Sequence, residues 1–156
     1  MKTFGMKAWL VLVAVVALGV AGSVSYARST SGFDGAALHP NEATTFAPTA
    51  NFGTVTSIAG SSGTHLWCIP LPVDSSGGKT IKVTAKGFSS SNVTCTARAL
   101  DSSGNATGGS TTRSLSIFGS FTQIVMSGVT VPAFGALNVC CTIAPGAEVA
   151  TVDYNP

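Results

Sequence analysis

The stretch from Lys79 to Leu100, KTIKVTAKGFSSSNVTCTARAL, decides the fold class. In its first half, Ile81, Val83 and Ala85 alternate with threonines and lysines. In its second half, four small or apolar residues from Val93 to Ala99 alternate with two threonines and an arginine. A period of two sends alternate side chains to opposite faces of a β-strand. The stretch therefore predicts two strands, each with one face in a core and one in water.

The same rhythm extends outward from this stretch. Short segments rich in Val, Ile, Thr and Phe are separated by clusters of Gly, Ser and Asn, which favour turns. Such even spacing is typical of two packed sheets. We expect one all-β domain over residues 51–156, an antiparallel β-sandwich of about eight strands, jelly-roll or immunoglobulin-like and braced by disulfides. The expected strands are Gly53–Ala59, Thr64–Leu71, Lys79–Gly87, Asn92–Leu100, Thr111–Phe118, Phe121–Val131, Ala136–Ile143 and Glu148–Tyr154.

Residues 1–27 differ from the rest of the chain. Lys2 and Lys7 give a positive start, an apolar run from Ala8 to Ala21 follows, and small residues precede the bond after Ala27. These are the three parts of an export signal. A membrane-spanning helix needs about 20 apolar residues, more than this run provides. We therefore expect a signal peptide cleaved after Ala27, and no membrane partner afterwards.

Residues 28–50 form a lead-in to the sandwich domain. They contain Gly, Pro, Thr and Ala without a regular period, and we expect them to be extended. Two arrangements are open from the sequence. The lead-in either docks on its own sandwich or reaches a neighbouring molecule as a donated strand.

The four cysteines are Cys68, Cys95, Cys140 and Cys141. An even count in an exported domain predicts two disulfides, for which three connectivities exist. Their spacing does not supply the ligand pairs of a zinc site. Strand alternation places Cys95 and Cys141 on core faces, which favours a buried bridge between them. Cys68 is then left to pair with Cys140.

The charge is balanced once the signal is removed. Lys2 and Lys7 account for the formal charge of +2, so residues 28–156 carry six basic and six acidic side chains. A nucleic-acid partner requires a basic surplus to neutralise phosphates, and this chain has none. Charged residues make up 9% of the chain, so Ser, Thr, Asn and Gly must cover most of the surface. A surface with little net charge favours association.

No residue pattern predicts catalysis. The histidines, His39 and His65, have no recognisable nucleophile arrangement beside them. Neither a Gly-x-Ser-x-Gly elbow nor a His-Glu-x-x-His motif occurs. The six carboxylates are scattered, whereas a glycosidase needs two that face each other. We therefore expect a protein that is not an enzyme, with no catalytic residues, no cofactor and no metal site.

Trp67 is the candidate for a ligand contact. Exposed aromatic rings form the flat platforms on which sugars bind. Trp67 is the single tryptophan after residue 27. It neighbours Cys68, so packing in or beside the core is its alternative role.

A series of short motifs runs along the chain: Gly35–Pro40, Asn51–Gly53, Trp67–Pro70, Val93–Thr96, Cys141–Ile143 with Pro145, and Ala150–Tyr154. Their order resembles that of a loose group of small exported bacterial proteins, largely uncharacterised, with a Cys-Pro strand, a Ser/Thr-Cys-Thr strand and a late Cys-x-Leu/Ile-Pro strand. The resemblance covers Phe33 to Tyr154 and implies export and the fold, but no activity. The group often has a cysteine in place of Leu38. Cys140 is an addition, which implies that it takes the partner of that cysteine.

These observations favour a secreted, non-enzymatic structural or surface-associated protein, extracellular or periplasmic. It would self-associate through its neutral surface or an exposed strand edge. The alternative is an extracellular binding module for glycans or for another exported protein, which rests on the fold class.

Overall fold

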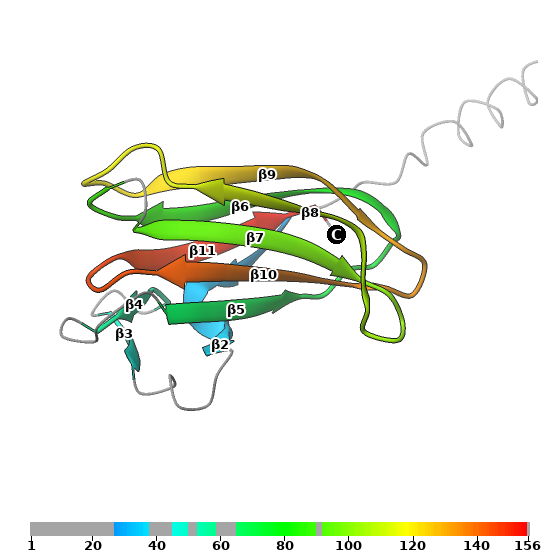
Figure 1. The fold of residues 1–156 in the computed structure, drawn as a ribbon, viewed down its shortest axis with the longest axis horizontal. Helices are drawn as coiled ribbons and strands as arrows, with labels where there is room; N and C mark the ends of the chain where they lie inside the picture. The colour runs from blue at the N-terminus through cyan, green and yellow to red at the C-terminus, as the bar shows by residue number, and fades with distance from the viewer. Residues whose placement is uncertain (1–26, 38–44, 50–52, 59–64, 90–91, 156) are drawn as a thin grey trace, which may run out of the picture.

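A computed structural model describes residues 27–37, 45–49, 53–58, 65–89 and 92–155, so the predicted signal before Ala27 lies outside the described residues. The described strands form two antiparallel sheets packed face to face (Figure 1). None of the described segments is a helix long and apolar enough to cross a membrane. The strands are β1 (Arg28–Ser31), β2 (Ala36–Ala37), β3 (Phe46–Pro48), β4 (Val55–Ser57), β5 (His65–Leu71), β6 (Gly77–Lys86), β7 (Val93–Leu100), β8 (Ala106–Ser114), β9 (Thr122–Val131), β10 (Ala136–Ile143) and β11 (Glu148–Tyr154), with one 3-10 turn, η1 (Gly32–Asp34).

The order of the strands identifies the topology. The six-stranded sheet runs β3-β4-β11-β6-β9, with β1 also paired to β11, and the five-stranded sheet runs β2-β5-β10-β7-β8. From β4 to β11 the chain changes sheet at every connection except that between β7 and β8. Eight strands arranged in this way form a jelly roll. The predicted all-β sandwich is confirmed, and of the two expected topologies it has the first.

Alternating side chains fill the space between the sheets. Every second residue of β10 from Leu137 to Ile143 is fully buried, and β6 behaves likewise from Ile81 to Ala85. Burying a Val, Leu or Ile side chain contributes about 1.5–3 kcal/mol each, so this alternating burial stabilises the sandwich. The bounds of β10 and β11 coincide with the predicted ranges, and all other predicted strands but one agree within two residues at each end.

The bounds of strand β8 differ from those that the sequence predicts. The sequence predicts a strand over Thr111–Phe118, whereas β8 runs from Ala106 to Ser114. Its first half contains Gly108 and Gly109, which are typical of turns. Here both have positive φ, 69° and 84°, in a bulge where the pairing with β7 changes register. A Cβ on Gly108 would lie 1.7 Å from the carbonyl oxygen of Thr130 on β9, so glycine is required where the two sheets approach.

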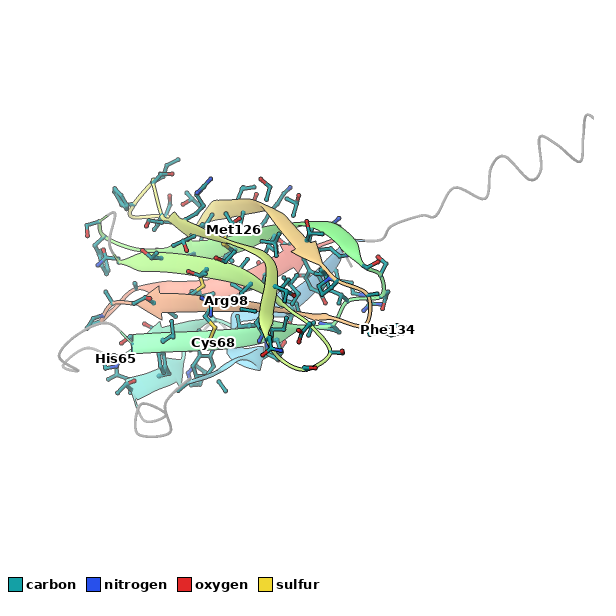
Figure 2. All side chains as sticks on the ribbon, turned by 45° about the vertical axis from the view of Figure 1, so that its right-hand side comes forward. His65, Cys68, Arg98, Met126 and Phe134 are labelled. Atoms are coloured by element: carbon teal, nitrogen blue, oxygen red, sulfur yellow. A yellow bond between two sulfur atoms is a disulfide. The ribbon has the colours of Figure 1, made fainter. Side chains whose placement is uncertain are left out.

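Two disulfides join β10 to the strands on both of its sides. Cys140 lies opposite Cys68 of β5 and is bonded to it, and Cys141 lies opposite Cys95 of β7 and is bonded to it. Adjacent residues of a strand point to opposite faces. The Cys95–Cys141 bridge is therefore in the core, and the Cys68–Cys140 bridge is on the outer face (Figure 2). This is the pairing that strand alternation favours.

The lead-in is more ordered than the sequence predicts, because its described residues supply three short strands. β1 pairs with β11 and β3 with β4 in the six-stranded sheet, while β2 pairs with β5 in the other sheet. The described lead-in thus docks on its own sandwich, the first of the two arrangements left open. These pairings are two to four residues long, too short for a period of two to be visible in the sequence.

Candidate functional site

The outer surface of the five-stranded sheet, which we call the open face, carries mainly hydroxyl, amide and small apolar side chains. It consists of the outward residues of four strands, with Arg98 near its middle. Those residues are Leu66, Cys68 and Pro70 on β5, Asn138, Cys140 and Thr142 on β10, Thr94, Thr96, Arg98 and Leu100 on β7, and Ala106, Ser110, Thr112 and Ser114 on β8.

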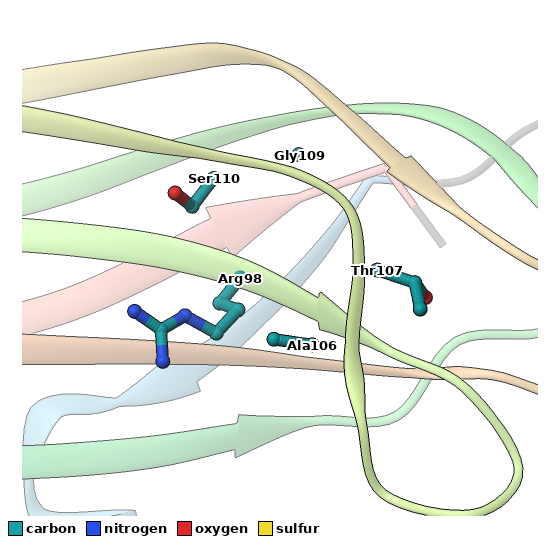
Figure 3. Close-up of a pocket in the computed structure, with 5 residues that line it drawn as sticks. All are labelled: Arg98, Ala106, Thr107, Gly109 and Ser110. Atoms are coloured by element: carbon teal, nitrogen blue, oxygen red, sulfur yellow. The ribbon is translucent and has the colours of Figure 1, made fainter.

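Two hollows lie on the open face and share Arg98. The first encloses about 330 Å³ and lies over β5, β10 and β7; its lining residues are Leu66, Thr96, Arg98, Leu100, Asn138, Cys140 and Thr142. The second encloses about 340 Å³ and lies between β7 and β8 (Figure 3); its lining residues are Arg98, Ala106, Thr107, Gly109 and Ser110. Arg98 therefore stands between two adjacent depressions of similar size.

Strand register explains the position of Arg98. It lies directly opposite Asn138 on β10 and opposite Ser110 on β8. Opposed residues of an antiparallel pair have Cβ atoms about 4.5–5.5 Å apart, so an amide and a hydroxyl flank the base of the arginine side chain. The bulge at Gly108 and Gly109 bends β8 next to this row, and the second hollow lies against the bend.

Two pairs of hydroxyl groups on the open face are hydrogen-bonded between β7 and β8. Thr94 Oγ1 and Ser114 Oγ are 2.9 Å apart, and Thr96 Oγ1 and Thr112 Oγ1 are 2.8 Å apart. Each hydroxyl has one donor and two acceptor positions. Because a single bond joins each pair, its members keep further positions for a ligand or solvent.

The charge of Arg98 is not matched by a partner. Arg98 is exposed and makes no hydrogen bond or ion pair with the described residues. Within the described part of the chain, no carboxylate lines either hollow. Elsewhere Arg28 pairs with Asp74, and Lys86 Nζ lies 3.5 Å from Glu148 Oε1. Among the residues that the structure describes, none therefore occupies a donor of the Arg98 guanidinium group.

Trp67 lies in the core and not on the open face. It is 8% exposed, and its ring packs on Phe46 with centroids 4.8 Å apart. Its indole Nε1 donates a hydrogen bond of 2.7 Å to the carbonyl oxygen of Gly32 in the lead-in. The ring has no exposed face for a sugar, so the predicted ligand contact at Trp67 finds no support. Its alternative role in the core is the one that the structure shows.

The described residues show no catalytic arrangement around the histidines or carboxylates that the sequence offered as candidates. His65 lies at the start of β5 with its ring edge-on to Phe46, at a centroid distance of 6.1 Å. His39 lies outside the described residues. Among the residues that the structure places, no three His, Cys, Asp or Glu side chains are grouped to hold a metal ion.

The two ends of the sandwich carry further exposed side chains. His65 and Phe134 mark opposite ends (Figure 2). Phe134, in the β9–β10 turn, is 95% exposed with a φ of 57°, a conformation that bulky side chains rarely adopt. It borders a hollow of about 310 Å³ that Asp74 also lines. The other end, which we call the apolar end, exposes four large apolar side chains: Phe88, Ile117, Phe118 and Phe121.

Sequence reasoning placed Arg98 on the outward face of its strand but did not single it out. Alternation gives the direction of a side chain, whereas the order of strands in a sheet depends on distant pairings. Asn138 lies forty positions further along the chain, and nothing local indicates that β10 and β7 are neighbours. The signal available was a lone basic residue among outward threonines.

No protein family and no curated protein matches this sequence. Solved structures do share the fold. The C-terminal CBM6 of LamC, a laminarinase from Zobellia galactanivorans, aligns with a TM-score of 0.57 and 15% identity over 84% of this chain and 100% of that one. The GH26-CBM35 β-(1,4)-mannanase of Podospora anserina aligns with a TM-score of 0.55 and 11% identity over 85% of this chain and 28% of that one.

A third similar structure is the enzymatically active domain of tailspike protein 4 from bacteriophage CBA120. It aligns with a TM-score of 0.53 and 12% identity over 88% of this chain and 20% of that one. The chain thus spans the whole of the LamC module but less than a third of the mannanase and the tailspike. At these identities the likeness shows the fold alone. The fold and site define a jelly-roll β-sandwich with a polar open face centred on one arginine.

Proposed function

We propose that the chain is an exported, non-catalytic module that binds glycans on its open face. The observation that carries the proposal is the pair of adjacent hollows that meet at Arg98. Sugars present hydroxyl groups that both donate and accept hydrogen bonds, and the hollows supply matching groups from Asn138, Thr142 and Ser110. Two neighbouring depressions suit a chain of sugar units better than one small molecule.

Further observations support this proposal. Proteins with the same fold include a module named for carbohydrate binding, the CBM6 of LamC, and a mannanase that carries a CBM35. The predicted signal at residues 1–27 and the two disulfides fit a protein of an oxidising, extracytoplasmic compartment. The resemblance over Phe33–Tyr154 to small exported proteins supports the same location.

The proposal is tested with oxidised protein spanning residues 28–156. A panel of soluble glycans is screened by affinity electrophoresis, and the best ligand is titrated by calorimetry. Asn138→Ala removes an amide from the first hollow, and we expect it to weaken binding by about threefold to tenfold, the value of one hydrogen bond. Gln123→Ala is the matched control, because Gln123 is an exposed amide on β9 in the other sheet.

Two results would count against the proposal. If the protein bound none of the glycans in the panel, the proposed function would be wrong. Binding that Asn138→Ala and Gln123→Ala leave equally unchanged would move the ligand away from the open face. The thermal midpoint of each variant shows that the fold is retained.

A second candidate function is self-association through the apolar end. Large apolar side chains gathered at one place of a surface mark interaction sites, and Phe88 and Ile117 are 65% and 59% exposed. A hydrogen bond from the Gly119 amide to the Gly87 carbonyl oxygen joins the two loops that carry them. Size-exclusion chromatography with light scattering tests this candidate. A mass that rises with concentration, and falls to the monomer in Ile117→Ser with Phe118→Ser, supports it; a monomer at every concentration removes it.

A further inference from the structure

We infer that the open face selects anionic glycans, and that Arg98 binds a carboxylate or sulfate group of the sugar chain. The inference rests on the proposed function and names the class of ligand for the same face. Four features of the described residues carry it: an arginine without a partner among them, no competing carboxylate along the hollows, no aromatic platform there, and hydrogen-bonding groups on both sides of the charge.

The position of Arg98 makes it available to a ligand in both hollows. It is exposed, it lines both depressions, and its neighbours across the strands, Asn138 and Ser110, are neutral. A guanidinium group presents a planar fork of donors that matches the two oxygens of a carboxylate or sulfate. A neutral sugar would use one or two of these donors, whereas an oxyanion would use the fork and the charge together.

Within the described part of the chain, no carboxylate along the two hollows competes for this arginine. The nearest described carboxylate along the chain is that of Asp101, in the turn between β7 and β8. Its Oδ1 accepts hydrogen bonds of 2.9 Å from the amides of Ser103 and Asn105, and its Oδ2 accepts one of 3.2 Å from the side chain of Asn105. These bonds lower the pKa of Asp101, so its charge is held within the turn.

The lining of the hollows favours charge recognition over stacking. None of the side chains described along either hollow is aromatic, and Leu66 and Leu100 are their largest apolar groups. Neutral polysaccharides are commonly bound by flat aromatic faces, which this surface lacks among its described residues. The affinity of the open face must therefore come from hydrogen bonds and from the charge of Arg98.

Hydrogen-bonding groups lie on both sides of the charge. Asn138 and Thr142 line the first hollow, and Thr107 and Ser110 line the second. An acidic sugar unit over Arg98, flanked by hydroxyl-rich units in the two hollows, would use the side chains of Asn138, Thr142 and Ser110.

The test compares three hexasaccharides of equal length by calorimetry at low salt: an oligouronate, a sulfated galactan fragment and a neutral β-glucan. We expect at least one anionic hexamer to bind about tenfold or more tightly than the neutral one. Arg98→Ala should remove about tenfold or more of that affinity, since a charged hydrogen bond is worth about 1.5–3 kcal/mol. Arg98→Lys keeps the charge but lacks the planar fork of donors. Its affinity for the anionic hexamer should therefore lie between those of the unchanged protein and of Arg98→Ala.

The matched control is Arg113→Ala. Arg113 is also an exposed arginine of this sheet, but it lines neither hollow and its guanidinium donates to the carbonyl oxygen of Thr112 at 3.0 Å. Its replacement should leave the affinity within about twofold, the range of a surface substitution. Binding of the uronate alone would identify a carboxylate, and binding of the sulfated fragment alone would identify a sulfate; both support the inference.

The failures of the two proposals are distinguishable. Equal affinity for the neutral and anionic hexamers, with Arg98→Ala equal to Arg113→Ala, overturns the selection of anionic glycans but leaves glycan binding intact. Failure of all three hexamers and of the wider glycan panel overturns both.

Discussion

The outer faces of the two sheets use charge in opposite ways. On the six-stranded sheet, which presents what we call the paired face, Lys82 lies directly opposite Asp153, and Lys86 forms an ion pair with Glu148. On the open face, Arg98 has neutral residues opposite it on both neighbouring strands. The two faces belong to the same sandwich and both are built on alternation. They differ in whether charges meet their partners within the sheet.

This difference indicates which face has charged groups that can interact with a ligand. An exposed ion pair is worth about 0–1 kcal/mol to the fold, and its charges are already compensated by each other. Arg98 forms no such pair with the described residues, so none of them competes with a bound group for its donors. The paired face therefore serves the fold, and the open face is the one suited to recognition. The predictions below test this contrast from its largest expected effect to its smallest.

The largest effects are expected from the two disulfides, of which the Cys68–Cys140 bridge lies on the open face. Cys68→Ala with Cys140→Ala should lower the free energy of unfolding by about 2–4 kcal/mol, because β5 loses its covalent link to β10. Urea denaturation of the oxidised protein measures the change. A loss below about 0.5 kcal/mol, the size of an ordinary surface substitution, would show that this bridge adds nothing to the open face.

The core bridge is the matched comparison. Cys95→Ala with Cys141→Ala should lower the free energy of unfolding further than the outer pair does. Both sulfur atoms are fully buried, so their removal also leaves a cavity in the core.

An intermediate effect is expected when the open face is made to resemble the paired face. Ser110→Asp places a carboxylate opposite Arg98, which should form an ion pair and compete with an anionic ligand. The affinity for the anionic hexamer should fall about tenfold, equivalent to 1.4 kcal/mol, while the thermal midpoint stays the same or rises slightly. Calorimetry measures the affinity. Ser110→Asn, which adds similar bulk without charge, is the control; an equal loss there would mean that size and not charge is responsible.

The smallest effects concern the pairs within each face. A double-mutant cycle of Thr96→Val and Thr112→Val should give a coupling energy of about 0.2–1 kcal/mol that salt does not change. A cycle of Lys86→Met and Glu148→Gln should give a coupling of similar size that falls as salt is added. Thermal unfolding at low and high salt separates the two. Equal salt dependence of the cycles would contradict the contrast between hydroxyl pairs and charge pairs.

The sequence predicts the central strands well, because each of them carries its own evidence. β6, β7 and β10 each bury one face, so their alternation can be read without knowledge of their neighbours. The bulged strand β8 has no such pattern. Its glycines and hydroxyl side chains are exposed at the edge of a sheet, and local chemistry alone resembles a turn.

The candidate site is less predictable than the fold for a physical reason. Arg98, Asn138 and Ser110 become neighbours through the order β10-β7-β8, which depends on pairings between distant segments. Trp67 shows the opposite case. Its aromatic side chain suggested a ligand contact. In the structure the lead-in packs on the ring, and the carbonyl oxygen of Gly32 accepts its hydrogen bond. No periodic pattern in the sequence predicts this contact.

The place of β10 and β11 in the two sheets has a consequence for how the chain can mature. These strands come after all others in the sequence, yet each lies in the interior of its sheet, between strands made much earlier. As a chain emerges from its N-terminal end, Cys68 and Cys95 are exposed together before either of their partners has been made. A bond formed between these two at that stage must be exchanged once Cys140 and Cys141 arrive, so maturation depends on thiol–disulfide exchange or on delayed oxidation.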